Sequence, residues 1–410
     1  MKKIAILVDL ELSESAGGHV KYWERICNSI KDSYKDFNLE VIFLGKELKK
    51  KSISKNINFF TIRPLISSKI LKPLGVDADV TDLSPFNIRL FFMLKRYDLI
   101  HTTDQFFSMA RTAKHASKFW KIPLTTSLHT DTPSYTEYYV KKILSNFPRL
   151  VNDFLVYKIK IHKKISKNQV KKFKKYLVHC RYAMINDKLN VSKFNFSKEV
   201  KSKISRLSRG VNKKIFKKVK INKERLLKKY EINKNEKIIF FCGRIHELKG
   251  AVFLSKVHKI IQNTGYKVVS IFAGQNLHGK ECLKYGGSRI KLVDYLDEKE
   301  ISQLYNLCDL FVFPSKFEIG PQVVLEAKSC GAISVVTPKG GGKRISANGI
   351  DGIIIENYDP KEWASRIIKL LKKQEKLKYM RKMILSNYQP PSWEQVFEEH
   401  FHNKWRKILN

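Results

Sequence analysis

Short apolar runs alternate with amphipathic stretches along the first half of the chain. Each run has the length and composition of a strand that is buried in a parallel sheet. The expected strands lie at 4–8, 39–44, 99–102 and 124–128. Between them, apolar residues at helical spacing predict helices, especially over 19–30 and 104–119. This alternation of strand and helix favours a parallel α/β domain.

The middle of the chain is long, basic and amphipathic. Apolar positions over 140–159 follow helical spacing and predict helices that are interrupted or kinked at Pro148. The short run 176–178 predicts a return to a strand. The Lys-rich segment 213–229 has the composition of a connection between domains, so we place the domain boundary near Val211.

The second half repeats the α/β rhythm more regularly. The expected strands and helices are 237–242, 251–262, 267–273, 289–293, 298–308, 310–313, 321–330, 333–337 and 352–355. Two α/β domains in tandem are therefore predicted, over 1–211 and 212–385. The last segment, 386–410, carries aromatic and apolar residues at helical spacing, and we expect a helix that packs across the junction.

Charge adds a second prediction. The 410 residues include 79 Lys and Arg against 38 Asp and Glu, a net charge of +41. Of these, 29 basic and 4 acidic residues lie within 141–230. Such an excess indicates an anionic partner, which could be nucleic acid, an acidic lipid surface or a phosphorylated ligand. A Lys-rich solvated surface without a partner is the alternative that composition alone allows.

Several classes of protein are disfavoured. No apolar run reaches the roughly 18 residues that a spanning helix needs, and Met1 leads into a strand-like run instead of a signal-peptide core. A cytoplasmic or peripheral protein is therefore expected. The six cysteines are scattered without a C-x-x-C pair, so neither a disulfide framework nor a zinc cage is indicated.

The loop after the strand 310–313 carries candidate chemistry. Gly320 and Pro321 begin a helix there, so backbone N–H groups face whatever lies beyond the carboxyl end of the strand, which is an anion-binding geometry. Glu318 lies in the loop and Glu326 about a turn and a half into the helix, which would place two carboxylates near one pocket. The alternative is that Glu318 complements the helix dipole and Glu326 is a solvated helix residue.

Three other loops hold candidate site residues. Arg244 can pair with a phosphate through two hydrogen bonds and Lys249 adds a point charge, although surface charge is the simpler reading. Gly17 and Gly18 could wrap a phosphate at a helix start or only form a turn. His129 follows a strand, where an imidazole could contact a bound hydroxyl, move a proton or be purely structural.

Five motifs occur together in a fixed order. They are Gly17-Gly18, Arg209-Gly210-Val211-Asn212, Gly243-Arg244 with Lys249-Gly250, Glu318-x7-Glu326 and Ser392-Trp393-Glu394. Together they resemble the retaining GT-B glycosyltransferases of glycosyltransferase family 4, or group 1. The resemblance covers most of the chain. It implies two Rossmann-like α/β domains that face a central cleft, the first on the acceptor side and the second binding the nucleotide-sugar.

The resemblance also implies residue roles. The implied catalytic residues are His129 and Glu318, and the implied donor-binding residues are Gly17, Gly18, Arg244, Lys249, Ile319, Gly320 and Glu326. In this scheme Arg244 and Lys249 hold the diphosphate, and Glu326 binds the ribose. Glu318 would contact the donor sugar. Enzymes of this kind generally need no catalytic metal, so no cofactor is expected beyond a UDP- or GDP-sugar donor.

The acceptor is the least defined part of the prediction. The stretch 128–131, with the tyrosines that follow it, resembles a segment of glycosyltransferases that act on membrane lipids. We therefore expect transfer to a lipid or lipid-linked acceptor at the cytoplasmic face of the membrane, with segment 141–230 on an anionic lipid surface. A soluble acceptor is the alternative. A nucleic-acid-binding protein is the alternative from another class, but no nucleic-acid module is recognisable.

One feature departs from the family pattern, and another matches a metal-binding motif only formally. Gly340–Arg344 stands where an acidic residue often follows the glycine-rich turn, so the transferred sugar is left open. Asp77 and Asp79 form a D-x-D, the metal-diphosphate motif of the other large glycosyltransferase fold. They do not follow a buried strand, and a turn or cap role is assigned instead.

Overall fold

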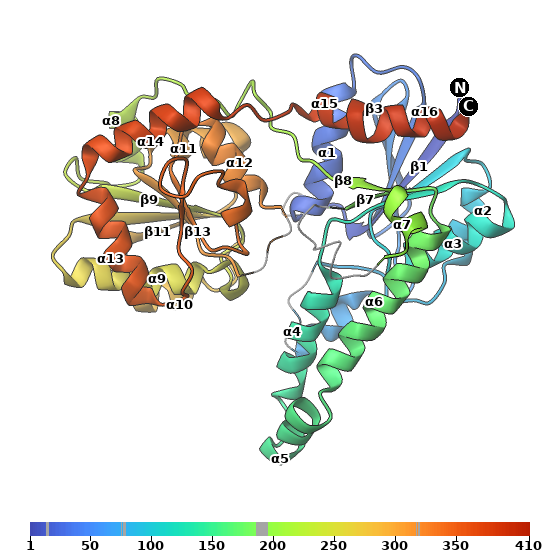
Figure 1. Ribbon diagram of the computed structural model, residues 1–410, viewed down its shortest axis with the longest axis horizontal. Coiled ribbons are helices and arrows are strands. Elements are labelled where there is room, and N and C mark those ends of the chain that lie inside the picture. The colour runs from blue at the N-terminus through green and yellow to red at the C-terminus, as the bar shows by residue number, and fades with distance from the viewer. Residues whose placement is uncertain (14–15, 75, 77–78, 186–195, 317, 319) are drawn as a thin grey trace. The chain divides into compact units, whose positions relative to one another are not determined.

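The computed structural model describes residues 1–13, 16–74, 76, 79–185, 196–316, 318 and 320–410. The chain forms two compact units (Figure 1), of which the first joins Met1–Ser208 to Trp393–Asn410 and the second is Arg209–Ser392. The division thus follows Ser208, close to Val211, and the final helical segment belongs to the first unit.

An eight-stranded sheet forms the centre of the first unit. Its strands are β1 (Lys3–Glu11), β2 (Asn38–Leu44), β3 (Lys49–Ser54), β4 (Ile57–Ile62), β5 (Leu99–Thr102), β6 (Leu124–Ser127), β7 (Tyr182–Ile185) and β8 (Ile204–Arg206). They lie in the order β3-β4-β2-β1-β5-β6-β7-β8, and β3 runs antiparallel to β4 while the other described pairs are parallel. The apolar run of β1 lies at the centre, where both faces are covered.

Helices cover this sheet. They are α1 (Gly18–Ile30), η1 (Ser68–Leu74), α2 (Ile88–Leu94), α3 (Ser108–Phe119), α4 (Thr132–Leu144), α5 (Arg149–Asp153), η2 (Phe154–Lys158), α6 (Ile161–His179) and α7 (Lys198–Ser202). The chain returns at its end as α15 (Trp393–Phe397), η7 (Glu398–His402) and α16 (Asn403–Leu409). Trp393, Phe401 and Trp405 of this return are buried in one core with Trp23 of α1, which explains their helical spacing.

Helices α4 and α6 form a hairpin that projects from the first unit, with α5 and the π-helix η2 at its tip (Figure 1). The predicted interruption at Pro148 is confirmed, because this residue is the N-cap of α5. The predicted strand at 176–178 is wrong. Those residues continue α6, since Phe173, Tyr176 and Leu177 are buried at the spacing of one helical face, and the next strand begins only at Tyr182.

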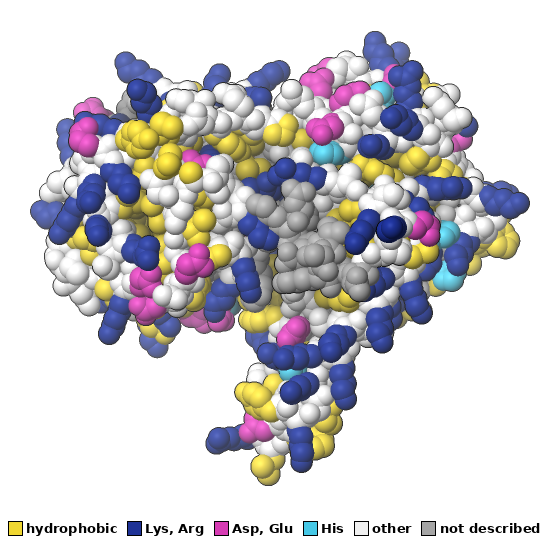
Figure 2. Space-filling model, in the orientation of Figure 1, with side chains coloured by type: hydrophobic (Ala, Val, Ile, Leu, Met, Phe, Trp, Pro, Cys, Tyr) yellow, Lys and Arg dark blue, Asp and Glu magenta, His cyan; other side chains and the backbone are white. Residues whose placement is uncertain are grey.

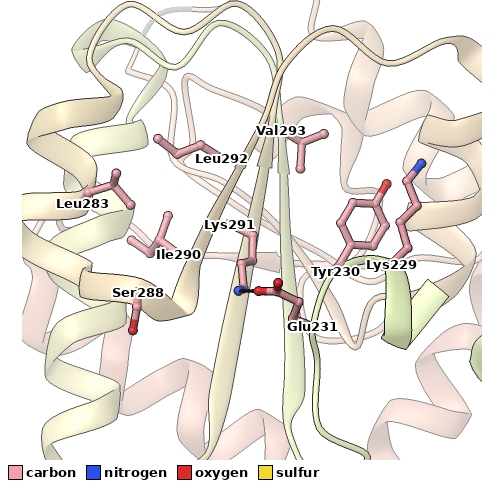
Figure 3. Close-up of a pocket in the computed structure, with 9 residues that line it drawn as sticks. All are labelled: Lys229, Tyr230, Glu231, Leu283, Ser288, Ile290, Lys291, Leu292 and Val293. Carbon is pink, nitrogen blue, oxygen red and sulfur yellow. Dashed lines mark hydrogen bonds and ion pairs between the residues drawn. The ribbon is translucent and has the colours of Figure 1, made fainter. Parts of the chain in front are cut away.

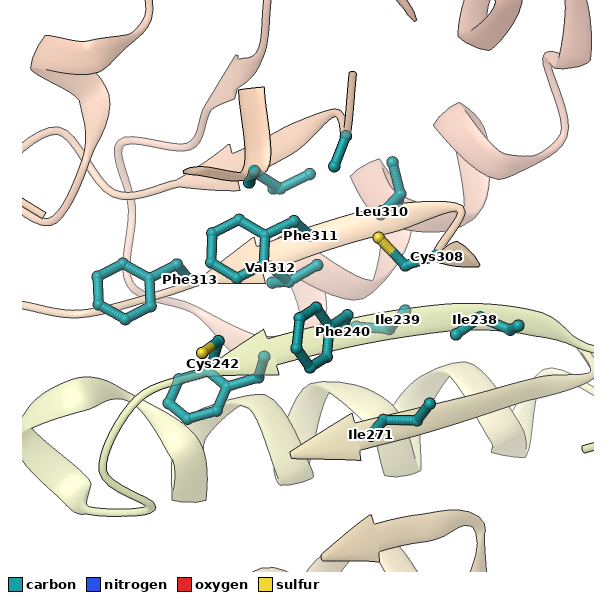
Figure 4. Close-up of a cluster of buried hydrophobic side chains, with 14 of the residues drawn as sticks. Ile238, Ile239, Phe240, Cys242, Ile271, Cys308, Leu310, Phe311, Val312 and Phe313 are labelled. Atoms are coloured by element: carbon teal, nitrogen blue, oxygen red, sulfur yellow. The ribbon is translucent and has the colours of Figure 1, made fainter. Parts of the chain in front are cut away.

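A six-stranded sheet forms the centre of the second unit. Its strands are β9 (Lys237–Cys242), β10 (Val268–Ala273), β11 (Ile290–Val293), β12 (Leu310–Phe313), β13 (Ser334–Val336) and β14 (Ile353–Ile354). They lie in the order β11-β10-β9-β12-β13-β14, and every pairing among the described residues is parallel. Figure 4 shows the apolar side chains of the neighbouring strands β9 and β12, with Phe240 beside Phe311 in the core.

Helical segments surround this second sheet. They are α8 (Lys223–Lys229), η4 (Glu247–Lys249), α9 (Ala251–Asn263), α10 (Gly279–Gly286), η5 (Gly287–Arg289), α11 (Glu298–Leu307), α12 (Gln322–Ser329), η6 (Gly342–Arg344), α13 (Pro360–Leu371) and α14 (Gln374–Asn387). The segment 213–229 is not a domain connection, because Phe216, Leu226 and Leu227 are buried in the core of the second unit. No helix within the described ranges is long and apolar enough to cross a bilayer.

Candidate active site

The loops that leave β9, β10, β12 and β13 gather at one edge of the second sheet. The carboxyl ends of parallel strands meet at such an edge, which is where open α/β sheets bind ligands. The first two loops touch directly, because a Cβ on Gly274 would lie 2.3 Å from the carbonyl oxygen of Gly243. Gly274 also has a φ of +136°, which other residues rarely adopt. The close contact between these two loops at the base of the candidate site therefore depends on glycine at position 274.

An ion pair joins two of the predicted site residues at this edge. Lys249 Nζ lies 2.5 Å from Glu318 Oε1, and the two side chains are 17% and 16% exposed. Ser315 Oγ lies 3.3 Å from the same Glu318 oxygen and can donate to it. The ammonium and the carboxylate are therefore held together and reachable from solvent, although 69 positions separate them in the chain.

The turn before α9 holds Lys249 in place. His246 Nδ1 accepts a hydrogen bond from the Leu248 backbone N–H at 3.1 Å, and the His246 ring lies 4.5 Å from the ring of His278. Gly250 follows with a φ of +82°, and a Cβ there would lie 2.4 Å from the carbonyl oxygen of Pro314. The β9 and β12 loops consequently pack backbone to backbone beneath the ion pair. Arg244 of the same turn is half-buried.

The glycine-rich turn after β13 packs onto the loop that carries Glu318. Thr337 Oγ1 donates to the carbonyl of Ser315 at 2.5 Å and accepts from the Gly340 backbone N–H at 2.7 Å. A Cβ on Gly340 would lie 2.0 Å from the same carbonyl oxygen. In the sequence, Gly340 is notable only as part of a departure from the family pattern. In the structure, the two loops can pack this closely only because residue 340 has no side chain.

Glu326 lies on α12 and is only 3% exposed. This burial excludes the alternative of a solvated helix residue. Burial raises the pKa of Tyr305 and of Tyr388, and the nearby Glu326 carboxylate raises both further. The carboxylate therefore lies in the interior, among phenol groups. Gly320 is buried before this helix, and Ile319 lies outside the described residues.

A buried ion pair elsewhere in the second unit has no counterpart among the predicted site residues. It joins the last turn of α12 to Asp351, two positions before β14. Lys328 Nζ lies 2.7 Å from Asp351 Oδ2 and donates to the carbonyl of Arg344 at 2.9 Å, and its side chain is 1% exposed. Burial raises the pKa of Asp351, but hydrogen bonds from Lys328 and from backbone N–H groups outweigh it and hold the pKa below its ordinary value. A single Lys in a Lys-rich chain carries no sequence signal for this role.

The carboxyl edge of the first sheet brings together Gly17, Gly18 and His129. Gly17 is the N-cap of α1, and His19 of its first turn stacks on His129 with ring centroids 4.5 Å apart. His129 is 5% exposed, and its Nε2 is hydrogen-bonded to Ser127 Oγ at 2.8 Å. The sequence did not identify His19, whose contribution depends on this stacking.

Burial shifts the pKa of the ionisable groups at this first edge in the direction that favours their neutral forms. It lowers the pKa of His101 to about 3, and the imidazole bridges Thr125 Oγ1 and Ser127 Oγ at 2.9 Å each. Burial also raises the pKa of Asp9 to about 7 and that of Asp104 to about 6. The two sheet edges therefore differ in electrostatic character.

A separate groove of about 550 Å³ runs beside the edge strand β11 (Figure 3). Its lining includes Tyr230, Leu283 and Leu292, together with the ion pair Lys291–Glu231 at 2.6 Å. No residue predicted for the active site lines this groove, so it is not part of the candidate site.

Comparisons with known proteins place this geometry in a family context. Residues 222–384 match the family model "Glycosyl transferases group 1". Spore coat protein SA of Bacillus subtilis is 28% identical over 180 residues, which are 40% of this chain and 47% of that protein. A D-inositol 3-phosphate glycosyltransferase of Segniliparus rotundus is 26% identical over 170 residues, 39% of this chain and 38% of the relative. The match thus spans less than half the length of each of these relatives.

Solved structures match the whole chain. HepE from Anabaena in complex with UDP-glucose has a TM-score of 0.69 at 16% identity, over 99% of this chain and 100% of that chain. Sucrose-phosphate synthase from Thermosynechococcus elongatus has a TM-score of 0.70 at 15% identity, over 100% and 99%. WaaG, a glycosyltransferase involved in lipopolysaccharide biosynthesis, has a TM-score of 0.62 at 13% identity, over 99% of each. This chain has the GT-B glycosyltransferase fold, and its residues 222–384 match the group 1 glycosyltransferase family model.

Proposed function

We propose that the protein is a retaining glycosyltransferase that takes its sugar from a nucleotide-sugar donor. The observation that carries the proposal is the Lys249–Glu318 pair, set at the carboxyl edge of a parallel sheet beside Arg244. HepE, which shares the fold, was crystallised with UDP-glucose and with UDP and glucose. A UDP-sugar donor is consistent with that likeness, and a GDP-sugar fits the same chemistry.

The proposed chemistry follows from the charges at this edge. When the bond between the anomeric carbon and the donor diphosphate breaks, negative charge grows on the departing phosphate, and fixed positive groups stabilise it most. Arg244 can offer two parallel N–H donors and Lys249 a compact ammonium. Glu318, which is held by Lys249, would face the donor sugar near its reacting carbon. Glu326 would bind the ribose hydroxyls from the buried side of the pocket.

Replacing Glu326 tests the donor site. Glu326→Ala should weaken binding of UDP or GDP, measured by calorimetry, and reduce nucleotide-sugar hydrolysis. Glu375→Ala, at a side chain of the same unit that is 85% exposed, should leave both unchanged and serves as the matched control. Undiminished sugar transfer by Glu326→Ala would contradict the assignment.

For the acceptor, we propose a lipid or lipid-linked molecule at the cytoplasmic face of a membrane. The basic segment 141–230 supports this, and so does the likeness to WaaG, a glycosyltransferase involved in lipopolysaccharide biosynthesis. A small phosphorylated acceptor is the second candidate, because relatives from Segniliparus and Corynebacterium are named for D-inositol 3-phosphate. Parallel transfer assays onto total membrane lipid and onto inositol phosphates would separate the two.

Peripheral attachment to an anionic membrane is part of the same proposal. If five Lys or Arg faced an anionic leaflet at roughly 1 kcal/mol each, the attraction would reach about 5 kcal/mol, which suits reversible association. Cosedimentation with anionic vesicles should then fall steeply as salt rises from about 0.1 to about 0.5 M. Absence of binding at low salt would favour the small soluble acceptor.

A further inference from the structure

The projecting hairpin ends in a group of exposed apolar side chains. Five apolar residues at its end, which we call the apolar tip, are exposed: Phe147 (50%), Leu150 (86%), Val151 (42%), Phe154 (50%) and Tyr157 (71%). Single exposed apolar residues are ordinary, but a group of them within one short stretch marks an interaction site. The apolar tip is therefore a candidate surface for a partner.

The exposed residues of the tip do not serve the internal packing of the hairpin. Leu150, Val151, Phe154 and Tyr157 follow the spacing i, i+1, i+4, i+7, which places them along one helical face. Val156, from the same stretch, is only 8% exposed and supplies the hairpin's internal packing instead. The exposed face thus remains available for contacts outside the hairpin.

Positive charge surrounds the tip. Residues 132–179 contain twelve Lys and Arg but only Glu137 and Asp153 as acidic residues. The side chain of Arg149, next to Leu150 in the chain, is 94% exposed, and its Nε lies 3.8 Å from Asp153 Oδ2. Figure 2 shows the hairpin with basic side chains along its shaft and apolar ones at its end. The surface is therefore complementary to a partner that is apolar inside and anionic outside.

Four exposed lysines follow the apolar tip directly in the chain. Lys158, Lys160, Lys163 and Lys164 are exposed and begin where the tip ends. Lys160, with a φ of 55°, separates η2 from α6, so Lys163 and Lys164 lie in the first turn of a new helix that starts at the end of the hairpin. These charges would stay at the headgroups while the tip lies below them, as in interfacial amphipathic helices.

We propose that the apolar tip inserts into an anionic lipid bilayer, with the lysines at the start of α6 over the headgroups. The inference rests on the proposed function, whose lipid acceptor would lie in that bilayer, and it deepens it. Attachment then has an apolar part that salt does not screen, in addition to the electrostatic part. A soluble protein partner for the tip is the competing outcome of the test.

The first experiment compares two matched double variants of the full chain in cosedimentation. Leu150→Ser/Phe154→Ser removes apolar surface from the tip, and Leu48→Ser/Phe92→Ser removes it from two sites elsewhere on the first unit that are 74% and 60% exposed. With vesicles of phosphatidylcholine and phosphatidylglycerol, the tip variant should bind at least about 30-fold more weakly. Its remaining binding should vanish at high salt, while the control variant should match the wild type.

A second experiment reads insertion directly. All six native cysteines are buried, so Leu150→Cys offers a solvent-accessible thiol for an environment-sensitive dye. The dye should shift to shorter wavelength with the mixed vesicles and be quenched by lipids brominated in their acyl chains. A dye on Leu48→Cys should do neither.

Each outcome decides a different part of the proposal. Equal vesicle binding by the tip variant and the wild type, or an unquenched dye at position 150, would overturn the inference, and so would wild-type protein that does not bind the mixed vesicles. UDP and GDP binding without vesicles is measured on the same variants. Its absence in the wild type would contradict the proposed function alone, whereas intact nucleotide binding with no insertion would overturn only the membrane anchor.

Discussion

The carboxyl edges of the two sheets begin from the same local plan and end with opposite chemistry. In each, a glycine that follows a parallel strand is the N-cap of the next helix, Gly17 for α1 and Gly250 for α9. The first edge buries His101 and Asp9 and favours their neutral forms. The second edge keeps Lys249 and Glu318 paired and partly exposed. One fold can therefore provide a nearly neutral surface and a charged one, because burial and not topology sets the charge.

Under the proposed function, the two edges would bind different parts of the reactants. A diphosphate needs charge that is fixed before it arrives, which the second edge supplies through interlocking loops. A sugar or acceptor hydroxyl needs hydrogen-bonding groups without net charge, as in the chain from His101 through Ser127 to His129. The predictions below disturb one of the two units at a time.

The largest expected effect comes from breaking the buried Lys328–Asp351 pair in the second unit. Lys328→Ala leaves the Asp351 carboxylate buried without its ammonium partner and should lower the free energy of unfolding by about 3–5 kcal/mol. Urea-induced unfolding of the second unit measures it, with Lys372→Ala, at an exposed site, as the control. Restored stability in Lys328→Met/Asp351→Leu would support the charge argument, and a loss below about 1 kcal/mol in the single variant would contradict it.

Removing the partly exposed ammonium of Lys249 at the carboxyl edge of the second sheet should affect catalysis more than folding. Lys249→Ala should reduce kcat by about 10²–10³-fold, or about 3–4 kcal/mol, because the departing diphosphate loses a fixed positive group. The turnover of a nucleotide-sugar is the measurement. Lys256→Ala, on the exposed face of α9, should turn over normally. An unchanged kcat in Lys249→Ala would remove the basis for calling this edge a donor site.

The first edge should respond to pH. Because burial raises the folded pKa of Asp9 from 3.8 to about 7, the folded state keeps a proton that the unfolded chain releases. This contribution to stability is complete below the unfolded pKa and is lost as pH rises through about 7, by about 2 kcal/mol between about pH 5 and pH 7. Asp9→Asn should therefore show a flatter decline of unfolding free energy over that interval.

His101 has a depressed pKa and acts in the opposite direction, since its contribution to stability is lost as pH falls from about 6.5 to about 3. The wild type and Asp9→Asn both keep His101, so its contribution cancels when their curves of unfolding free energy against pH are compared. Asp32→Asn, at an exposed carboxylate, should follow the wild-type curve. Parallel curves for Asp9→Asn and the wild type would count against the buried, protonated carboxyl.

The smallest expected effect concerns His129. If its ring positions the transferred sugar or the acceptor, His129→Asn should lower sugar transfer by about 10-fold, or about 1.4 kcal/mol, and leave nucleotide binding in the second unit unchanged. His115→Asn, on the exposed face of α3, is the control. Equal loss of nucleotide binding and transfer would point to a structural role instead.

The sequence was most informative where one physical signal dominates. Strands β1, β9 and β12 lie at or near their expected bounds, because a short apolar run between polar loops has few other solutions. The family resemblance assigned Lys249 and Glu318 to one donor site, and the two side chains are paired at 2.5 Å.

Other features depend on tertiary contacts that a single sequence does not display. The strand β3 begins with three exposed lysines and lacks the apolar pattern of a strand, since it pairs only at the edge of its sheet. Lys328 reads as one more surface lysine until its neighbours enclose it. His19 gains its place only by stacking on a residue 110 positions later.

The return of the chain into the first unit sets an order on its synthesis. Trp393, Phe401 and Trp405, which complete the core around Trp23, follow the whole second unit in the chain. On the ribosome, the second unit can therefore fold while the first still exposes the side of α1 that these residues cover. A polypeptide interrupted near Ser392 would retain the charged edge but carry an open aromatic surface, which is the kind of surface that chaperones and proteases detect.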